Sequence, residues 1–373
     1  MPSPVYFINM RARQGLNLFD KIERLFKKSS LKQFVTGGDL LAVKIHFGED
    51  GNLSYIHPRI VRFIIEQLKK YNTKPFLTDA NSLYAGSRGE AVGHLQTAIG
   101  NGFDYSVVGA PLIISDGLRG STATKIEINL NHFKEVMLGS EVCHADKMIC
   151  LTHFKCHELT GFGGAIKNVG MGLASRAGKL AMHSTLNPYI SEDCVACGVC
   201  LKYCGSGAIK MSEGEKKAYI DDKACIGCGE CLISCPQHRI KIRWNESVAN
   251  FQEKICEYAY GLLVKRKLPC YYVNFINNLS PVCDCYPYSD TAITPDIGIL
   301  ASYDPVAIDQ ASADLVINSP GIKGTALNKS FAPGDDKFRD IYPHIDWEVQ
   351  LAYGEKIGLG RRQYQLINIF SEE

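Results

Sequence analysis

Two closely spaced cysteine runs constrain the fold of this 373-residue chain more than any other feature. The first run is Cys194-x-x-Cys197-x-x-Cys200-x-x-x-Cys204, and the second is Cys225-x-x-Cys228-x-x-Cys231-x-x-x-Cys235-Pro236. Three cysteines spaced by two residues let one tight loop hold three corners of a cubane, while the fourth cysteine reaches the neighbouring cubane. The spacing therefore predicts two 4Fe-4S clusters that exchange their fourth ligands.

Crossed ligation assigns every cysteine of the two runs. One cluster takes Cys194, Cys197, Cys200 and Cys235, and the other takes Cys225, Cys228, Cys231 and Cys204. A zinc ribbon would leave four of these thiols unused, and a disulfide framework is typical of small secreted chains. Gly205 stands where the second run has Pro236, and glycine can make the same turn at some entropic cost. The arrangement resembles the bacterial ferredoxins, which implies a small α+β ferredoxin-like domain over residues 191–243.

Composition places this segment inside a larger globular protein. The chain is 46% hydrophobic and 21% charged, as expected for a folded protein of two or three domains. A formal charge of +2, with both signs interspersed, argues against a nucleic-acid partner. We expect no membrane partner, because no apolar run reaches about 18 residues and the start lacks a signal-peptide core. Clusters need reduced thiolates, so we expect a cytoplasmic protein of an anaerobic or microaerobic host.

Strands and helices alternate on both sides of the cysteine segment. We expect strands over residues 5–9, 40–45, 74–78, 147–151, 271–275 and 297–300, and helices over 16–28, from 58, over 248–264 and over 304–317. This pattern predicts an α/β fold, a mainly parallel sheet with helices on both faces. The cysteine segment interrupts it, giving three ranges: a first α/β part over 1–190, the insertion over 191–243 and a second α/β part over 244–373.

Polar side chains follow most of the expected strands, where parallel sheets bind ligands. His46 and Glu49 follow the second strand, and Asp79, Asn81, Tyr84 and Arg88 follow the third. His153 and His157 follow the fourth, Cys283 and Cys285 the fifth, and Asp304 the last. We predict that His46, Asp79 and Asn81 bind a cofactor or substrate. The Cys283-x-Cys285 pair is either a ligand or redox pair or two small residues packed in a turn.

A glycine-rich turn follows the fourth strand. Gly161, Gly163 and Gly164 leave backbone amides unshielded, and Lys167 and Asn168 come next. We expect an anionic group held by these amides and Lys167. The segment lacks the Gly-Lys-Ser/Thr of a P-loop and the G-x-G-x-x-G of a dinucleotide site.

Four segments resemble the DUF362 family. They are Lys44-Ile45-His46-Phe47-Gly48-Glu49, Leu77-Thr78-Asp79-Ala80-Asn81-Ser82-Leu83-Tyr84, the stretch from His153 to Asn168, and the stretch from Asp296 to Ala307. The resemblance covers nearly the whole chain, including the cysteine insertion, and implies an α/β fold and a redox character without naming a reaction.

A more distant resemblance concerns His157, Gly163-Gly164, Lys167 and His183, whose spacing is similar to that of the nickel-pincer lactate racemase family. In that family the lysine tethers the pincer cofactor and the later histidine binds nickel. The resemblance implies that Lys167 and His183 occupy those places.

These observations favour an iron-sulfur oxidoreductase. A redox partner, either a ferredoxin or a dehydrogenase, would pass single electrons through the two 4Fe-4S clusters to a small-molecule substrate. We predict that the catalytic residues are His153, His157, Lys167 and His183. Two alternatives stay open: an electron-transfer or cluster-carrying protein without catalysis, and a metal-dependent non-redox enzyme related to the nickel-pincer racemases.

Overall fold

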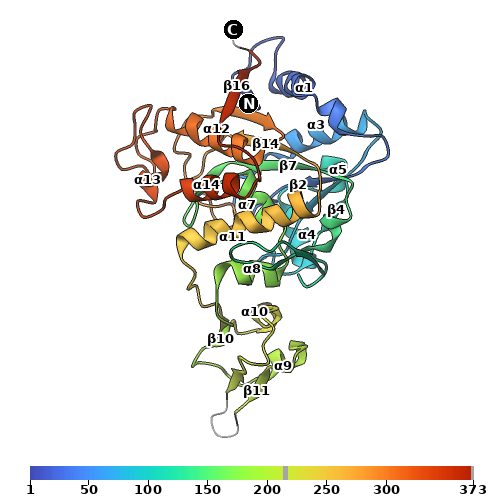
Figure 1. Ribbon diagram of the computed structural model, residues 1–373, viewed down its shortest axis with the longest axis vertical. Coiled ribbons are helices and arrows are strands. Elements are labelled where there is room, and N and C mark those ends of the chain that lie inside the picture. Colours follow the sequence, from blue (N-terminus) through green and yellow to red (C-terminus); the bar gives the residue numbers. More distant parts are fainter. Residues whose placement is uncertain (213–216, 371–373) are drawn as a thin grey trace.

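An eight-stranded sheet forms the centre of the computed structural model, which describes residues 1–212 and 217–370 (Figure 1). The strand order is β16-β1-β15-β14-β7-β2-β3-β4. The strands are β1 (Ser3–Asn9), β2 (Leu40–Lys44), β3 (Lys74–Asp79), β4 (Leu112–Ile114), β7 (Lys147–His153), β14 (Cys270–Ile276), β15 (Gly298–Ser302) and β16 (Tyr364–Asn368). The mainly parallel α/β sheet expected from the sequence is confirmed. The three domain ranges stay predictions, and two of them include residues 213–216 and 371–373, which lie outside the described part.

One strand of the sheet runs against the others. β15 pairs antiparallel with both β1 and β14, whereas the remaining neighbours pair in parallel. The residue that follows β15, Asp304, therefore lies at the opposite edge from the ends of β2, β3 and β7. Its carboxylate accepts hydrogen bonds from the amides of Val306 and Ala307, both at 2.9 Å, and caps helix α12 (Pro305–Ile317). The expectation that Asp304 joins the strand-end site is wrong.

Helices cover both faces of the sheet. Helices α1 (Leu18–Lys28) and α3 (Pro58–Lys69) belong to one apolar core, and α7 (Ala165–Gly170), α11 (Val248–Tyr260) and α12 belong to the other. Successive residues of β7 alternate between these cores, with Met148 and Cys150 in one and Ile149 and Leu151 in the other. Because both faces are buried, such strands read as continuous apolar runs.

The remaining elements connect or flank this framework. They are α2 (Leu31–Phe34), α4 (Ala91–Gly100), α5 (Tyr105–Val108), α6 (Ser140–Cys143), α8 (Arg176–His183), the π-helical turn η1 (Gly261–Lys265) that continues α11, α13 (Lys337–Ile341), α14 (Glu348–Lys356), and the short strands β5 (Ala123–Glu127), β6 (Glu135–Gly139), β8 (Lys155–His157) and β9 (Gly161–Gly163). None of the helices within the described residues has the length and apolar character that crossing a membrane requires.

The cysteine segment forms a lobe that projects beyond α8, at the end of the molecule opposite both termini (Figure 1). Its elements are β10 (Tyr189–Ile190), α9 (Val199–Tyr203), β11 (Ile209–Met211), β12 (Ala218–Ile220), α10 (Glu230–Ser234) and β13 (Ile240–Lys241). β10 pairs antiparallel with β13, so the chain enters and leaves the lobe at neighbouring points. This closeness is what allows such a segment to interrupt an α/β domain.

The two halves of the lobe have the same local structure. Helices α9 and α10 each follow a glycine at φ +71°, Gly198 and Gly229, and each ends at the fourth cysteine of its run, Cys204 and Cys235. Glycine adopts this left-handed conformation without the steric cost that other residues meet. The twofold sequence repeat therefore corresponds to a twofold structural repeat.

Candidate functional site

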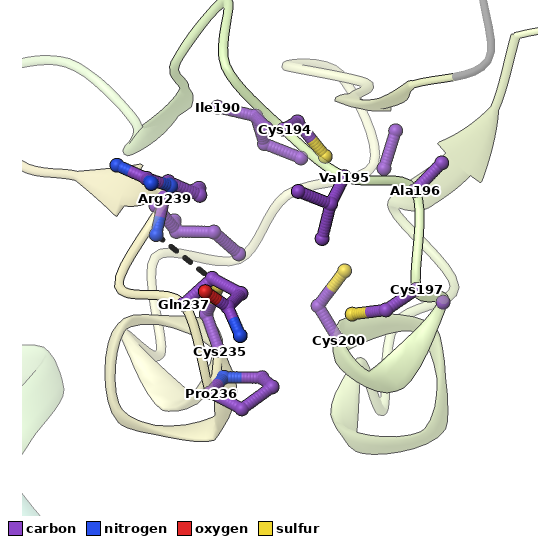
Figure 2. A pocket seen from close by; sticks show the side chains of 13 residues that line it. Ile190, Cys194, Val195, Ala196, Cys197, Cys200, Cys235, Pro236, Gln237 and Arg239 are labelled. Carbon is purple, nitrogen blue, oxygen red and sulfur yellow. Dashed lines mark hydrogen bonds between the residues drawn. The ribbon is translucent and has the colours of Figure 1, made fainter.

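Four cysteines from both runs line one cavity in the lobe. Cys194, Cys197 and Cys200 come from the first run, and Cys235 faces the cavity across from Cys197 and Cys200 (Figure 2). The cavity measures about 350 Å³ including its open mouth, and Ile190, Val195, Pro236 and Ile240 are among its apolar lining residues. The amide of Arg239 donates a hydrogen bond to Cys235 Sγ at 3.2 Å. Four thiols around an apolar cavity, with an amide donor to sulfur, suit a 4Fe-4S cluster.

The other four cysteines form a second group. Burial, together with the neighbouring Cys228, Cys225 and Cys204, raises the pKa of Cys231 to about 12. Burial also raises the pKa of Cys225, with Cys228 and Cys204 among the contributors. Cys204 therefore lies with the second run, as Cys235 lies with the first. Within the described residues, no three His, Cys, Asp or Glu side chains surround a single metal ion, whereas a cubane separates its thiolates by iron and sulfide.

A buried ion pair stands where β2 and β3 end. Lys44 Nζ lies 3.0 Å from Asp79 Oδ1, and both side chains are almost completely buried. Burial lowers the pKa of Lys44. Burial by itself would raise the pKa of Asp79, but interactions with Lys44 first, and then with His46, His94 and Arg88, outweigh burial and hold that pKa below its ordinary value. Asp79 is thus a carboxylate surrounded by cationic and imidazole groups.

Arg88, Glu49 and His94 also contact this buried ion pair or its partners. Together with Lys44 and Asp79 they form a buried polar cluster, called the polar interior below. Arg88 Nε lies 3.1 Å from Glu49 Oε2, and Arg88 Nη1 lies 3.7 Å from Asp79 Oδ2. The ring of His94 stands 3.8 Å from Asp79 Oδ2, and burial lowers the pKa of His94 to about 3. His94 was not predicted as a site residue, because a single histidine inside a helix does not by its sequence indicate a site.

The predicted ligand His46 lies at the same edge of the sheet. Its Nδ1 accepts a hydrogen bond from the amide of Gly48 at 3.0 Å. Burial, followed by the charge of Arg88, lowers the pKa of His46 well below its ordinary value. His46 is therefore a neutral imidazole whose Nε2 carries the proton.

The predicted ligands Asn81 and Asn168 direct their amides to other parts of the protein. Asn81 Nδ2 donates to Asp116 Oδ1 at 2.9 Å and to Gly117 O at 2.8 Å. Asn168 Oδ1 accepts from Lys44 Nζ at 2.6 Å, and its Nδ2 donates to Leu151 O and Thr152 Oγ1, both at 3.0 Å. Both asparagines connect strand ends, so their observed contacts are those of positioning residues.

Asp284 anchors the loop after β14 to the end of β7. His153 Nδ1 lies 2.9 Å from Asp284 Oδ2, and Lys155 Nζ lies 3.2 Å from the same oxygen. Ser54 Oγ donates to Asp284 Oδ1 at 3.1 Å. Burial by itself would raise the pKa of Asp284. Electrostatic interactions with His153 and Lys155 outweigh the effect of burial and hold that pKa well below its ordinary value. The predicted catalytic residue His153 is thus tied to a carboxylate that the sequence analysis did not single out.

Two more predicted catalytic residues, Lys167 and His157, lie near Cys283, whereas the ring of the third, His183, packs against Trp244 and Phe251 at 4.8 and 4.5 Å between ring centres. Lys167 Nζ lies 3.9 Å from Cys283 Sγ. His157 Nδ1 accepts from the amide of Leu159 at 3.1 Å, and its Nε2 lies 3.7 Å from Glu158 Oε2. Burial, together with the nearby His157 and Lys167, lowers the pKa of His183 to about 3. The structure therefore brings His157, Lys167 and His183 into one region, next to His153.

The glycine-rich turn binds a carboxylate of the protein itself. The amides of Ala165 and Ile166 donate to Asp309 at 2.7 and 2.9 Å. A Cβ on Gly164 would stand 2.3 Å from Asp309 Oδ1, and Gly161 has φ +71° against Trp347. Gly163 has an ordinary φ, and a Cβ there would meet Lys155 and Lys167 at van der Waals distance. Asp309 comes from α12, more than a hundred residues away, and takes the amides of Ala165 and Ile166. An anionic group bound by the three glycines and Lys167 stays a prediction.

The family of the chain is shown by sequence. Residues 41–314, more than half of the chain, match the family described as "Domain of unknown function (DUF362)". The chain belongs to the DUF362 family. No curated protein matches this DUF362 chain.

Two solved structures resemble this DUF362 protein in fold. The lactate racemase apoprotein from Thermoanaerobacterium thermosaccharolyticum has 13% identity and a TM-score of 0.42, covering 82% of this chain and 57% of that chain. A protein from Thermotoga maritima has 10% identity and a TM-score of 0.41, covering 81% and 58%. The DUF362 chain thus spans less than two thirds of either structure.

The lobe of this DUF362 protein contacts the polar interior through one arginine and one loop. Arg176 is fully buried, donates to Ser82 O at 2.7 Å and also donates to Gly89 O. A Cβ on Gly229 would stand 3.1 Å from Arg176, and the charge of Cys228 acts on the Arg176 guanidinium. Residues 82–89 also carry Tyr84 and Arg88. The second cysteine group therefore lies against the loop that walls the polar interior.

Proposed function

We propose that this protein is an iron-sulfur oxidoreductase whose two 4Fe-4S clusters deliver electrons to the polar interior at the carboxyl edge of the sheet. The observation that carries the proposal is the position of the second cysteine group, which packs through Gly229 and Arg176 against loop 82–89. Tyr84 of that loop donates to Cys285 O at 2.8 Å, so a single loop connects the cysteine group with the strand-end residues. Cluster and reaction site are neighbours in this arrangement.

The residues around the interior have distinct roles in the proposal. The clusters supply single electrons. Lys167 and Lys155 bind an anionic substrate in this proposal. Lys167 Nζ lies 3.9 Å from Cys283 Sγ, and Lys155 Nζ lies 3.2 Å from Asp284 Oδ2, so both ammonium groups are at the strand ends. His157, with Nδ1 accepting from a backbone amide, carries its proton at Nε2 and donates it to the reduced substrate.

The proposal places the redox partner at the outer part of the lobe. Cys197 is exposed there, and Val195 beside it is 60% exposed. The first cluster would receive electrons at this surface from a reduced ferredoxin or a dehydrogenase, and the second would pass them inward. Each step then covers a short distance.

Metal analysis of anaerobically purified protein tests the proposal. Two clusters require roughly eight irons and eight sulfides per chain, and anaerobic EPR should show both clusters reduced by dithionite. Protein that folds with no iron, or with iron that no reductant affects, would exclude an iron-sulfur oxidoreductase.

A second candidate is the metal-dependent non-redox enzyme related to the nickel-pincer racemases, in which the clusters are structural. Support for it comes from Lys167 and His157, which are both near enough to His183 to lower its pKa. The same metal analysis separates the two candidates. One further transition metal per chain, lost in His183→Ala but retained in the matched His344→Ala variant, would favour the second.

The Lys167→Ala variant separates both enzymes from a pure electron carrier. The variant should keep both clusters assembled and reducible, because Lys167 contacts none of the eight cysteines of the two runs in the described structure. Substrate reduction should fall by about a hundredfold or more, since a positioned charge that stabilises a developing anion contributes about 3 to 4 kcal/mol. A carrier without its own reaction would instead transfer electrons to its partner at the rate of the unmodified protein.

A further inference from the structure

Cys283 and Cys285 lie in a tight turn that the rest of the protein holds firmly. The amide of Tyr286 donates to Cys283 O at 3.1 Å, which closes a β-turn with Asp284 and Cys285 at its centre. The Asp284 carboxylate is bound by His153, Lys155 and Ser54, and Asp284 O accepts from the amide of Glu49 at 3.1 Å. The turn brings two thiols with one residue between them into a fixed position at the strand-end site.

The two thiols interact with each other and with a cation. The amide of Cys285 donates a hydrogen bond to Cys283 Sγ at 3.4 Å, and the Cys285 thiol is near enough to influence the pKa of Cys283. Lys167 Nζ approaches Cys283 Sγ to 3.9 Å. The hydrogen bond from Cys285 is the largest influence that lowers the pKa of Cys283, and Lys167 and His157 act in the same direction against burial. A stabilised thiolate beside a second thiol is the arrangement used for thiol–disulfide exchange.

We propose that Cys283 and Cys285 form a redox-active dithiol–disulfide couple that reduces a low-molecular-mass disulfide. The Cys283 thiolate attacks one sulfur of the substrate, which forms a mixed disulfide and releases one thiolate. Cys285 then attacks Cys283 Sγ, closes the internal disulfide and releases the second substrate thiol. Two electrons and two protons restore the dithiol. The sum is one disulfide, two electrons and two protons converted into two thiols.

The electrons for this cycle come from the clusters, so this part of the inference rests on the proposed function. Clusters held by the eight cysteines would supply electrons singly, so two reduced ferredoxin molecules would be oxidised in one turnover. The route is short in structure: Tyr84 donates to Cys285 O at 2.8 Å, and Arg88 Nη2 donates to Tyr84 at 2.8 Å. Both residues belong to the loop that packs against Arg176 and the second cysteine group. A dithiol couple also explains how one-electron centres serve a two-electron reaction.

The first experiment measures the couple itself. Anaerobic protein is equilibrated with mixtures of reduced and oxidised dithiothreitol, quenched in acid and alkylated. After proteolysis, the mass of the peptide that contains both cysteines is measured by mass spectrometry. The fraction that has lost two hydrogens and escapes alkylation should rise from near zero to near completion across the series. It should be absent in Cys285→Ser and unchanged in Cys270→Ser, which removes a thiol outside the site. A peptide that stays fully alkylated in oxidised dithiothreitol, in both the unmodified protein and Cys270→Ser, would overturn the inference.

The second experiment measures electron delivery. Protein carrying the oxidised pair is mixed anaerobically with reduced ferredoxin, and recovery of the dithiol is followed by the same alkylation. Recovery should be complete in the unmodified protein and lost in Cys204→Ala, which lacks a ligand of the second cluster. Recovery at an unchanged rate in that variant would exclude the cluster route. Protein without iron would defeat the proposed function, whereas the dithiothreitol series would still decide whether the couple exists.

Discussion

At the scale of single residues, the interior of this protein is held together by charges that are buried in pairs. Lys44 and Asp79 meet at 3.0 Å, and Asp284 binds His153 and Lys155. A charge removed from water is tolerated only when a partner of opposite sign and further hydrogen bonds compensate it. Sequence shows these residues only as polar positions after strands. Their pairing depends on which strands become neighbours.

A first prediction concerns the Lys44–Asp79 pair. Lys44→Met should lower the free energy of unfolding by about 3 to 5 kcal/mol, because Asp79 stays buried without its nearest cation. Asp79→Asn should also destabilise. The double variant should lose clearly less than the sum of the two, since each single change leaves the other charge unpaired. Denaturant unfolding of the four proteins measures this, and exactly additive losses would show that the two side chains do not interact.

A second prediction concerns acid stability. The pKa of Asp79 in the folded protein lies below its ordinary value of about 4, so folding favours the carboxylate. The stabilisation is therefore present above about pH 4 and is lost as the pH falls below that value. The difference in unfolding free energy between the unmodified protein and Asp79→Asn should shrink over this range. Because acid damages clusters in both proteins alike, comparison of the two removes that contribution, and a constant difference would contradict the prediction.

At the scale of elements, the turn between β9 and α7 serves to position Lys167. Asp309 on α12 accepts hydrogen bonds from the first amides of α7, and Asn274 Nδ2 on β14 donates to the same carboxylate at 2.9 Å. The glycines are needed for this packing in different ways. Gly164 makes room for Asp309, and Gly161 reverses the chain beside Trp347.

A third prediction separates the glycines of this turn. Gly164→Ala should destabilise the protein by about 1 to 3 kcal/mol, because its Cβ would overlap the Asp309 carboxylate. Gly163→Ala should change stability little, since its Cβ would meet only the flexible stems of Lys155 and Lys167. Thermal or denaturant unfolding of the two variants provides the measurement. Equal losses in both would mean that Asp309 does not occupy the turn.

At the scale of the whole molecule, side-chain contacts as well as the two connecting segments hold the lobe against the α/β part. Leu83 and Leu180 of the α/β part belong to the same apolar cluster as Cys200, Cys231 and Leu232 of the lobe. Arg119 Nη1 lies 2.9 Å from Glu230 Oε1 across the same boundary. The lobe is therefore held in one orientation, which any electron path between the two parts requires.

A fourth prediction follows from the crossed cysteine groups. Cys235→Ala should remove the cluster of Cys194, Cys197 and Cys200 and leave the cluster that includes its own neighbour Cys231, because Cys235 lines the cavity of the first run. Cys204→Ala should do the reverse. Iron content near half of the normal value, with EPR of the surviving cluster in each variant, tests this. Loss of the cluster nearest in sequence would show that ligation does not cross.

Sequence by itself determined what depends on local spacing. Six strands of the sheet, the main helices and the repeat of the lobe follow from apolar periodicity, Pro58, Asp304-Pro305 and the cysteine intervals, because each is a property of a few neighbouring residues, whereas β4 and β16 were not predicted. The presence of His46, His153, His157 and Lys167 after strands was also visible, whereas His183 was singled out only by the resemblance to the racemase family. Only the tertiary structure decided the direction of β15, which removed Asp304 from the site, and the pairing of Asp284 with His153, of Asp309 with α7 and of Arg176 with the lobe. These contacts join residues far apart in the chain, and strand order and direction are set by the packing of the whole sheet.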